Sequence, residues 1–313
     1  MASIASKRVL VVGPENGLVA TVARELDAGN MPVTFVVDST IDWNEKTVVS
    51  KLFSKQKPFM LLHEMEFYRP ALRKRKAEPQ RAELLHRSQS LAEACAKHKC
   101  IVMHLSDYHV FGGDTKNAYD ENDPTAPLDN YGAWVAAAEQ HFADRIEKHL
   151  VLRFSWLIDA ESDNLFTRVL AVLSSGEEMR LSRYRRGAPT WRGDARRVIS
   201  GVVRQVMAGA ENWGCFHYCS VDSCNEWEFG REVEATLTDL RAPLGKIVAD
   251  DVKENKRFPS EPSSATLNSR RIRSNFGVHG RSWRQGLKAQ INHWLEHRVQ
   301  KTEDQRRTAN DRQ

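Results

Sequence analysis

Two side chains of this sequence, the hydroxyl of Ser106 and the phenol of Tyr131, are suited to a reaction in which a proton moves. Ser106 follows the apolar run 100–105, which predicts a buried strand, and Tyr131 opens an alanine-rich stretch that predicts a helix. A hydroxyl at the C-terminal end of a strand can meet a tyrosine at the start of the next helix over the edge of a parallel sheet. Open α/β sheets bind their ligands at that edge. The spacing therefore predicts a ligand site there, with a phenol able to donate a proton.

The residues around both side chains resemble the dTDP-4-dehydrorhamnose reductase branch of the extended short-chain dehydrogenase/reductase superfamily. The family reads Thr/Ser-Asp-Tyr-Val-Phe-Asp-Gly at the strand end, and residues 106–113 read Ser-Asp-Tyr-His-Val-Phe-Gly-Gly. The family then reads Glu-x-Asp-x-x-x-Pro-x-x-x-Tyr-Gly, which residues 121–132 repeat. The resemblance covers roughly residues 7–297. It implies that Tyr131 donates a proton to a carbonyl group whose oxygen Ser106 polarises.

The resemblance also implies where a nucleotide-sugar substrate would lie. Two candidates follow Ser106 directly at the strand end. Trp156 ends an Arg-x-Ser-Trp segment that the family shares and would offer the sugar a flat surface, although a large indole at a strand end as often only packs. The turn Gly-Ala-Pro-Thr at 187–190 repeats a family turn near the substrate. The substrate-binding candidates are Asp107, Tyr108, Trp156, Ala188, Pro189 and Thr190.

One position of the family pattern is not kept. Four residues after Tyr131 the family has a lysine, and this chain has Val135. In the family the ammonium lowers the pKa of the tyrosine and binds the nicotinamide-ribose hydroxyls, because a nearby positive charge favours the phenolate. A valine can do neither, and residues 136–139 add no lysine or arginine within the next helical turn. The sequence therefore predicts a reductase-like site with impaired or lost chemistry.

The first predicted strand ends at Gly13, where a dinucleotide fingerprint would lie. Glycines between the first strand and the first helix let the backbone approach a pyrophosphate at the helix N-terminus. The family form is Gly-x-x-Gly-x-x-Gly. Here one residue is inserted between Gly13 and Gly17, and Ala20 holds the third place. Gly13, Asn16 and Gly17 are candidates for cofactor binding, while the carboxylate of Glu15 would repel a pyrophosphate. A tight turn without a ligand fits the motif about as well.

The ends of the next two predicted strands bear on the cofactor. Asp38 follows the glycines by about 20 residues, the distance at which a carboxylate accepts the 2′-hydroxyl of the adenosine ribose. This favours NAD over NADP, because a 2′-phosphate would meet a negative charge. An acid that only caps a strand at the surface is an equal alternative. At the end of the third predicted strand the family places small residues beside the cofactor, whereas this chain has His63 and Glu64, which would narrow or close the pocket.

The composition describes an ordinary globular protein. The 313 residues are 41% apolar and 28% charged, with a net charge of +5. So mild a charge predicts a solvated surface rather than a nucleic-acid partner. No run approaches the ~18 apolar residues of a membrane span, so we expect a cytoplasmic protein. The five cysteines fit a reducing compartment. Cys215, His217, Cys219 and Cys224 contain no Cys-x-x-Cys pair, so we expect buried thiols and no metal site.

Strands and helices alternate through the first half of the chain. This pattern predicts a Rossmann-type, doubly wound parallel sheet with a smaller C-terminal α/β substrate-binding portion. We expect residues 1–160 to form the dinucleotide-binding domain, its sheet completed by later segments, and residues 161–300 to form the substrate-binding portion. Residues 301–313 are charged and lack apolar periodicity, which predicts a disordered tail.

The sequence leaves three functions open. The first is a nucleotide-sugar-binding protein with impaired chemistry, acting as a homodimer or in the service of a partner enzyme, as the regulatory beta subunit of methionine adenosyltransferase does in this family. The second is an active NAD(P)H-dependent reductase of a 4-keto-sugar nucleotide, in which another cation replaces the lysine. The third is a scaffold that has lost its ligands, suggested by the inserted residue in the glycine loop, by Glu15 and by the His63-Glu64 pair.

Overall fold

The computed structural model of the chain describes residues 7–43, 45–65, 78–114, 117–240, 245–252 and 261–310. Six strands form one sheet in the order β10-β5-β4-β3-β1-β2. Every pairing between neighbouring strands is parallel, which confirms the predicted sheet. The strands are β1 Val9–Gly13, β2 Val33–Val37, β3 Met60–Glu64, β4 Ile101–Asp107, β5 His149–Phe154 and β10 Gly214–Tyr218.

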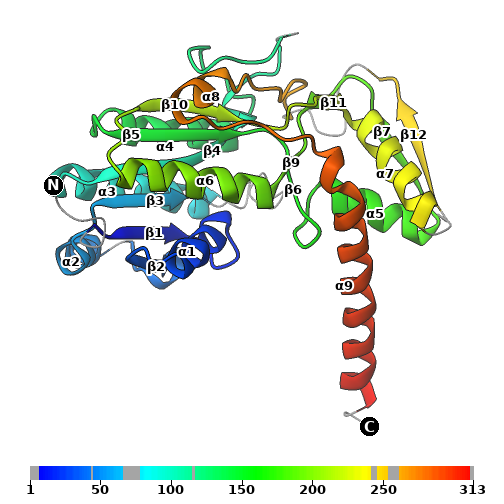
Figure 1. Ribbon diagram of the computed structural model, residues 1–313, viewed down its shortest axis with the longest axis horizontal. Coiled ribbons are helices and arrows are strands. Elements are labelled where there is room, and N and C mark those ends of the chain that lie inside the picture. Colours follow the sequence, from blue (N-terminus) through cyan, green and yellow to red (C-terminus); the bar gives the residue numbers. More distant parts are fainter. Residues whose placement is uncertain are drawn as a thin grey trace.

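Helices cover both faces of this sheet, and the strands are apolar on both sides for that reason. In β1, Val9 and Val11 face one core, while Leu10 and Val12 face the other, because successive side chains of a strand point in opposite directions. The first face is covered by α1 Leu18–Ala28 and α6 Arg192–Met207. The second is covered by α2 Lys46–Gln56, α3 Glu78–His98 and α4 Asn130–Ala143 (Figure 1).

The strand order reverses beside β1. The chain passes from β1 to β2 on one side and then crosses to β3 on the other. In open α/β sheets ligands bind outside the carboxyl ends of the strands at such a reversal. The 3-10 turns η2 Asp38–Thr40 and η5 Tyr108–Val110 continue β2 and β4 at this edge. The edge therefore gathers most of the residues that the sequence singled out.

The remaining elements form a smaller part, which faces the carboxyl ends of the strands (Figure 1). Its two-stranded sheets pair β6 Leu157–Ile158 with β9 Thr190–Trp191, β7 Glu178–Ser182 with β12 Lys246–Asp250, and β8 Arg186–Gly187 with β11 Cys224–Asn225. Its helices α5 Leu165–Ser175, α7 Glu226–Leu240 and α9 Arg284–Asn310 share a separate core around Phe166, Phe229 and Trp283. Another helix, α8 Arg270–Phe276, packs on the large sheet.

Two helix ends differ from those predicted. We expected the helix after Tyr131 to reach about residue 148, and α4 ends at Ala143. The sequence also predicts a disordered tail from 301, whereas α9 continues to Asn310 and extends away from the body (Figure 1). Lysine, glutamate, glutamine and arginine favour helix even where the residues are charged and lack apolar periodicity.

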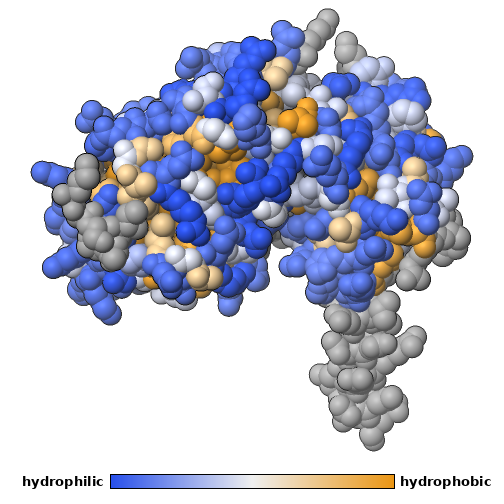
Figure 2. Space-filling view, in the orientation of Figure 1, coloured by the Kyte–Doolittle hydropathy of each residue, from blue (hydrophilic) through white to orange (hydrophobic). Residues whose placement is uncertain are grey.

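The surface is mainly polar. Figure 2 shows hydrophilic residues over most of the visible face, with hydrophobic residues in smaller patches between them. Among the residues that the structure describes, the large exposed hydrophobic side chains are scattered, at Leu128, Tyr184, Val221 and Val252. Of the helices that the structure describes, none is long and apolar enough to cross a membrane.

Candidate functional site

The phenol of Tyr131 is placed by the first turn of α4. Asp129 caps this helix by accepting a hydrogen bond from the backbone of Gly132, at 2.9 Å. Only glycine fits at 132, because a Cβ atom there would lie 2.2 Å from the carbonyl oxygen of His109. This close approach of α4 to η5 brings Tyr131, which is 3% exposed, against the end of β4. Its hydroxyl donates to Asp107 Oδ2 at 2.8 Å.

Asp107 also binds a buried histidine. Its Oδ1 accepts from the backbone N–H of His109 at 2.8 Å and lies 3.0 Å from Nδ1 of the same residue. The other ring nitrogen lies 3.3 Å from Glu261, which Tyr108 also contacts. Burial disfavours a charge on His109, but Asp107 and Glu261 outweigh it and raise the pKa of His109 to about 10. The charged ring of His109 is therefore linked to Tyr131 through Asp107, which binds both side chains.

The charge on Asp107 follows from the same contacts. Burial alone would raise the pKa of this carboxyl group. The adjoining imidazolium of His109 and the hydrogen bonds from His109 and Tyr131 prevail, and they hold the pKa of Asp107 below its usual range. The phenol of Tyr131 therefore donates to a carboxylate.

The hydroxyl of Ser106 is directed elsewhere. It donates to Glu139, which lies two turns beyond Tyr131 on α4, about 12 Å along the helix axis. Glu139 also accepts from Arg153 on β5, at 2.8 Å from Nε and 2.6 Å from Nη2. We expected Ser106 and Tyr131 to act on one carbonyl group, but their protons point at different carboxylates. The reason is that a buried ion pair on the α4 side of the sheet takes the only proton that Ser106 can donate.

Val135 occupies the position of the family lysine and is 4% exposed. It belongs to an apolar cluster that also holds Tyr108, Tyr131 and Ala188, with Trp156 packed against it. The structure thus brings the candidate proton donor together with three of the substrate-binding candidates. The isopropyl group of Val135 therefore lies in this cluster at the position where the family has the ammonium group of a lysine.

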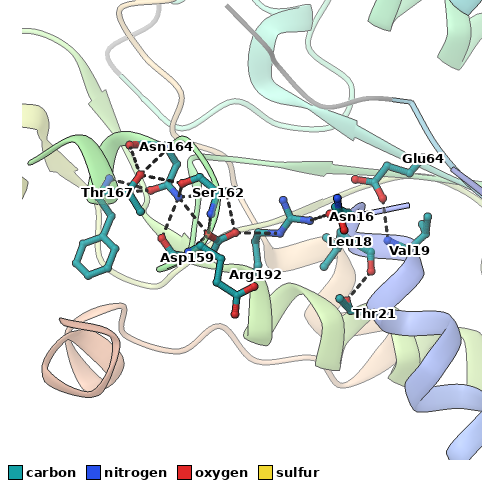
Figure 3. Close-up of polar contacts among 12 residues, drawn as sticks. Asn16, Leu18, Val19, Thr21, Glu64, Asp159, Ser162, Asn164, Thr167 and Arg192 are labelled. Atoms are coloured by element: carbon teal, nitrogen blue, oxygen red, sulfur yellow. Dashed lines mark hydrogen bonds and ion pairs between the residues drawn. The ribbon is translucent and has the colours of Figure 1, made fainter. Parts of the chain in front are cut away.

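The turn between β1 and α1 holds a carboxylate of the chain itself. Glu64, at the end of β3, is 2% exposed and accepts from the backbone N–H of Val19 at 2.8 Å (Figure 3). The backbone of Leu18 also hydrogen-bonds to this carboxylate, so Glu64 binds the first turn of α1. A Cβ atom on Gly17 would lie 2.5 Å from Glu64 Oε2. A dinucleotide diphosphate does not fit here, because it would meet a carboxylate that already uses these amides.

An arginine joins this turn to the smaller part. Arg192, the first residue of α6, donates from Nη2 to the carbonyl oxygen of Asn16 at 3.3 Å. Its Nε lies 3.2 Å from Asp159 Oδ2 in the loop that follows β6 (Figure 3). Asn16, a cofactor candidate, therefore contributes its backbone to a contact within the protein.

Asp38, the candidate for the ribose hydroxyl, is also engaged. Its Oδ2 lies 2.8 Å from Arg87 Nη1, and Arg87 reaches Glu83 at 2.6 Å as well. The guanidinium of Arg87 lies over the ring of Trp43, 5.5 Å from its centre. The sequence places Asp38 correctly at the end of β2, but it holds no signal for a partner that comes from α3.

The turn 187–190, which holds three of the substrate-binding candidates, connects the two parts. Ala188 donates its backbone N–H to Ser155 Oγ at 2.9 Å, and Thr190 donates its own to the carbonyl oxygen of Trp156 at 2.7 Å. The hydroxyl of Thr190 donates to the carbonyl oxygen of Ala188. Pro189 between them is buried. A Cβ atom on Gly187 would lie 2.4 Å from the indole of Trp156, so this glycine lets the ring pack flat.

Three further histidines are buried in the large part, among them His63, which was expected to narrow or close the cofactor pocket together with Glu64. His63 and His104 are paired through their Nδ1 atoms at 3.1 Å, and His217 lies 3.4 Å from Arg153. Burial lowers the pKa of His63 well below its usual value, and it lowers the pKa of His104 and of His217 to about 3. They are therefore neutral core side chains. The thiol of Cys219 points at the carbonyl oxygen of Leu267.

One group of potential metal ligands stands apart from this edge. Among the described residues, Glu161, His293 and His297 place one ligand atom each within 4.8 Å of one another. The first comes from the loop after β6 and the other two from α9.

Comparison with known proteins places this geometry in context. The family model described as the RmlD substrate binding domain matches residues 7–296. The dTDP-4-dehydrorhamnose reductase of Aggregatibacter actinomycetemcomitans is 22% identical over 285 residues, 90% of this chain and 97% of that protein. The dTDP-4-keto-6-deoxy-D-glucose reductase of Streptomyces niveus is 24% identical, over 92% of this chain and 93% of that protein.

Solved structures agree in fold. The dTDP-4-dehydrorhamnose reductase of Clostridium acetobutylicum superposes with a TM-score of 0.78 at 21% identity, covering 92% of this chain and 99% of that one. The reductase of Bacillus anthracis in complex with NADP gives 0.77 at 20% identity, with the same two coverages. The UDP-glucose 4-epimerase of Thermotoga maritima with UDP-glucose gives 0.76 at 13% identity, covering 93% and 99%.

Proposed function

The chain belongs to the RmlD substrate-binding domain family, and from this premise we propose that it binds a nucleotide sugar without performing the family's reductase chemistry. The observation that carries the proposal is the setting of Tyr131: its hydroxyl donates to Asp107, and the lysine position beside it is Val135. If Tyr131 gave its proton to a carbonyl group, a phenolate would be left against a buried carboxylate. Two like charges in contact disfavour that state, and a valine supplies no compensating charge.

The nucleotide-sugar part of the proposal rests on the relatives and on the smaller part of the fold. The relatives named above act on dTDP-linked sugars, and one structural neighbour holds UDP-glucose. In this chain Tyr108, Tyr131 and Trp156 gather beside the turn 187–190, where aromatic rings can pack against a sugar. A binding protein of this kind would work as a homodimer or together with a partner enzyme.

The cofactor part of the family's activity finds less support in this chain. The solved reductase of Bacillus anthracis holds NADP, and related enzymes hold NAD. Here the turn of Gly13, Asn16 and Gly17 would carry the diphosphate, but Glu64 lies in that place. We therefore derive no hydride-transfer step for this chain, and neither NAD nor NADP is favoured.

A second candidate function is supported by one observation. His109 is a buried cation, and its ring centre lies 5.1 Å from that of Tyr131. This imidazolium could replace the family lysine in an active NAD(P)H-dependent reductase. Two carboxylates, Asp107 and Glu261, already share its charge, and for that reason we rank this function second.

A single-turnover assay separates the two functions. With the protein in excess over NADH or NADPH and with dTDP-4-dehydrorhamnose present, we expect no loss of absorbance at the reduced nicotinamide band. Loss of a positioned proton donor costs a factor of about 10²–10⁴ in rate. Measurable oxidation would overturn the proposal, and loss of that oxidation in His109→Gln would establish the second function.

Binding is measured separately in the same samples. A nucleotide sugar that binds only the folded state raises the melting temperature, by an amount that grows with its concentration. We expect such a rise with dTDP-glucose and a smaller one with free glucose. If dTDP-glucose leaves the melting temperature unchanged, the nucleotide-sugar part of the proposal is wrong.

A further inference from the structure

We propose that the carboxyl group of Glu64 occupies the place of a dinucleotide's diphosphate in the β1–α1 turn and that it excludes dinucleotides from this chain. The inference rests on the cofactor part of the proposed function and deepens it. It assigns the exclusion of dinucleotides to one residue of β3.

The first step is the bonding of the α1 N-terminus. The first backbone N–H groups of a helix have no partner within the helix, and they carry a partial positive charge that attracts anions. Gly17, the N-cap of α1, has no side chain to satisfy them. Glu64 supplies the missing acceptor through its 2.8 Å bond from Val19. The backbone N–H that a dinucleotide's diphosphate would need is therefore already bonded to a carboxyl group of the chain.

The second step is the shape of the turn. Gly17 permits a close approach, and the group that makes this approach is Glu64: a Cβ atom on Gly17 would lie 2.5 Å from its carboxylate. At Gly13 a Cβ atom would meet the side chain of Val19 at 2.6 Å and Glu64 Cβ at 3.3 Å. The glycines of a dinucleotide fingerprint usually admit a phosphate to the backbone. In this chain the same absence of side chains makes room for a carboxylate.

The third step is how the sheet delivers the carboxylate. In β3, His63 is paired with Val12 of β1, and Glu64 is the next residue. Alternation along a strand sends His63 toward α4 and Glu64 toward α1. Glu64 is therefore aimed at the turn by the pairing of two central strands, and it is 2% exposed.

The charges that face Glu64 are few. Burial raises the pKa of Glu64 to about 7, against the opposing effects of Arg192 on α6 and of the α1 backbone, and Asp38 after β2 raises it further. The carboxyl group is then partly charged at neutral pH and becomes neutral as the pH falls. Repulsion of a diphosphate by Glu64 should weaken over the same range.

Equilibrium binding of NADH, NADPH and ADP by isothermal titration calorimetry tests the inference on the full chain. The variants are Glu64→Ala, which empties this place, and Glu64→Gln, which removes only the charge. We expect Glu64→Ala to bind all three at least about tenfold more tightly than the wild type, with Glu64→Gln between them. Circular dichroism and the melting temperature show whether each variant is folded, and Glu64→Gln decides the question if Glu64→Ala does not fold.

The matched control is Asp27→Asn, which removes one negative charge from an exposed residue at the C-terminal end of α1, away from the β1–α1 turn. We expect it to bind as the wild type does. The inference is overturned if neither Glu64 variant gains affinity over the wild type, or if Asp27→Asn gains as much. Wild-type protein that binds NADH without oxidising it would overturn this inference and leave the proposed function standing.

A different observation carries a second inference, a zinc-class metal site on the smaller part. His293 and His297 are four residues apart on α9, so they share one face of the helix, and their ring centres are 4.4 Å apart. Glu161 reaches His293 Nε2 at 3.2 Å. We infer that these three residues bind one divalent ion such as Zn²⁺, with a fourth position open to water.

The loop that carries Glu161 is already ordered for this role. Asp159 Oδ1 accepts from the backbone N–H of Glu161 at 2.8 Å. The side chain of Asn164 donates to the carbonyl oxygens of Asp159 at 2.9 Å and of Ser162 at 3.0 Å (Figure 3). The three ligand atoms lie within 4.8 Å of one another. Tetrahedral zinc has bonds of ~2.0–2.2 Å, so the side chains must rotate toward a shared ion to bind it.

Zinc titration of the full chain by calorimetry tests this site. We expect one Zn²⁺ per chain and at least about tenfold weaker binding in His293→Gln and in His297→Gln, since each removes one of three ligands. The control is His279→Gln, an exposed histidine outside the group, which should bind as the wild type does. Binding that is unchanged in both ligand variants, or absent from the wild type, would overturn the assignment.

Discussion

Replacing Arg153 with alanine is expected to lower the free energy of unfolding by about 3–5 kcal/mol, because Glu139 then remains buried without its cation. The two side chains are 7% and 9% exposed and share two hydrogen bonds. Burial disfavours the guanidinium charge, but the contact with Glu139 outweighs this and raises the pKa of Arg153. Ser106 completes the group and cannot replace the missing charge.

Urea denaturation followed by tryptophan fluorescence measures this loss. The control is Lys148→Ala, which breaks a 3.0 Å ion pair with Glu211 whose side chains are 51% and 70% exposed. An exposed pair of this kind contributes about 1 kcal/mol or less, so the control should unfold almost as the wild type does. A loss in Arg153→Ala no larger than that of Lys148→Ala would show that Glu139 finds another partner.

Replacing His109 with glutamine is expected to make stability depend less on pH in the alkaline range. The pKa of His109 in the folded chain is about 10, above the ordinary value of 6.5. A raised folded-state pKa means that the stabilisation is fully present below about pH 6.5 and is lost as the pH rises through about 10. The wild type therefore loses stability across this window, and His109→Gln lacks that loss.

At pH 6 the variant leaves Asp107 and Glu261 without the cation that they share, so it should be less stable than the wild type by about 3–5 kcal/mol. Urea denaturation of both proteins at pH 6, 8 and 10 measures the difference. Groups that titrate alike in the two proteins cancel in it, so its change with pH reports on His109. A difference that stays constant from pH 6 to pH 10 would mean that His109 is not charged in the folded protein.

The fold was predictable because its signals are local. The apolar run 100–105 predicted β4 Ile101–Asp107 to within two residues, and Gly13 and Asp38 mark the ends of β1 and β2 where they were expected. The effect of Val135 could be predicted from the sequence alone, because it depends on a spacing of four residues within one helix. The end of α4 was misplaced because the residues after Ala143 carry no strong stop signal.

The polar contacts of the site were not predictable, because they join residues far apart in the chain. Glu64 is 45 residues from Val19, and Asp38 is 49 from Arg87. The glycine motif correctly predicts that some group lies close to the backbone of the turn. A single sequence does not show whether that group is the phosphate of a ligand or a carboxylate of the chain itself. His109 shows the same limit, since its charge comes from a contact with Glu261 across 152 positions.

Arg192 has a mechanical consequence. It is the first residue of α6 in the large part. It donates a hydrogen bond to the carbonyl oxygen of Asn16 and forms an ion pair with Asp159, which belongs to the smaller part. A hinge movement that separates the two parts would break the contact of Arg192 with Asn16 or its contact with Asp159. A movement of the smaller part is thereby coupled to the loop that precedes α1.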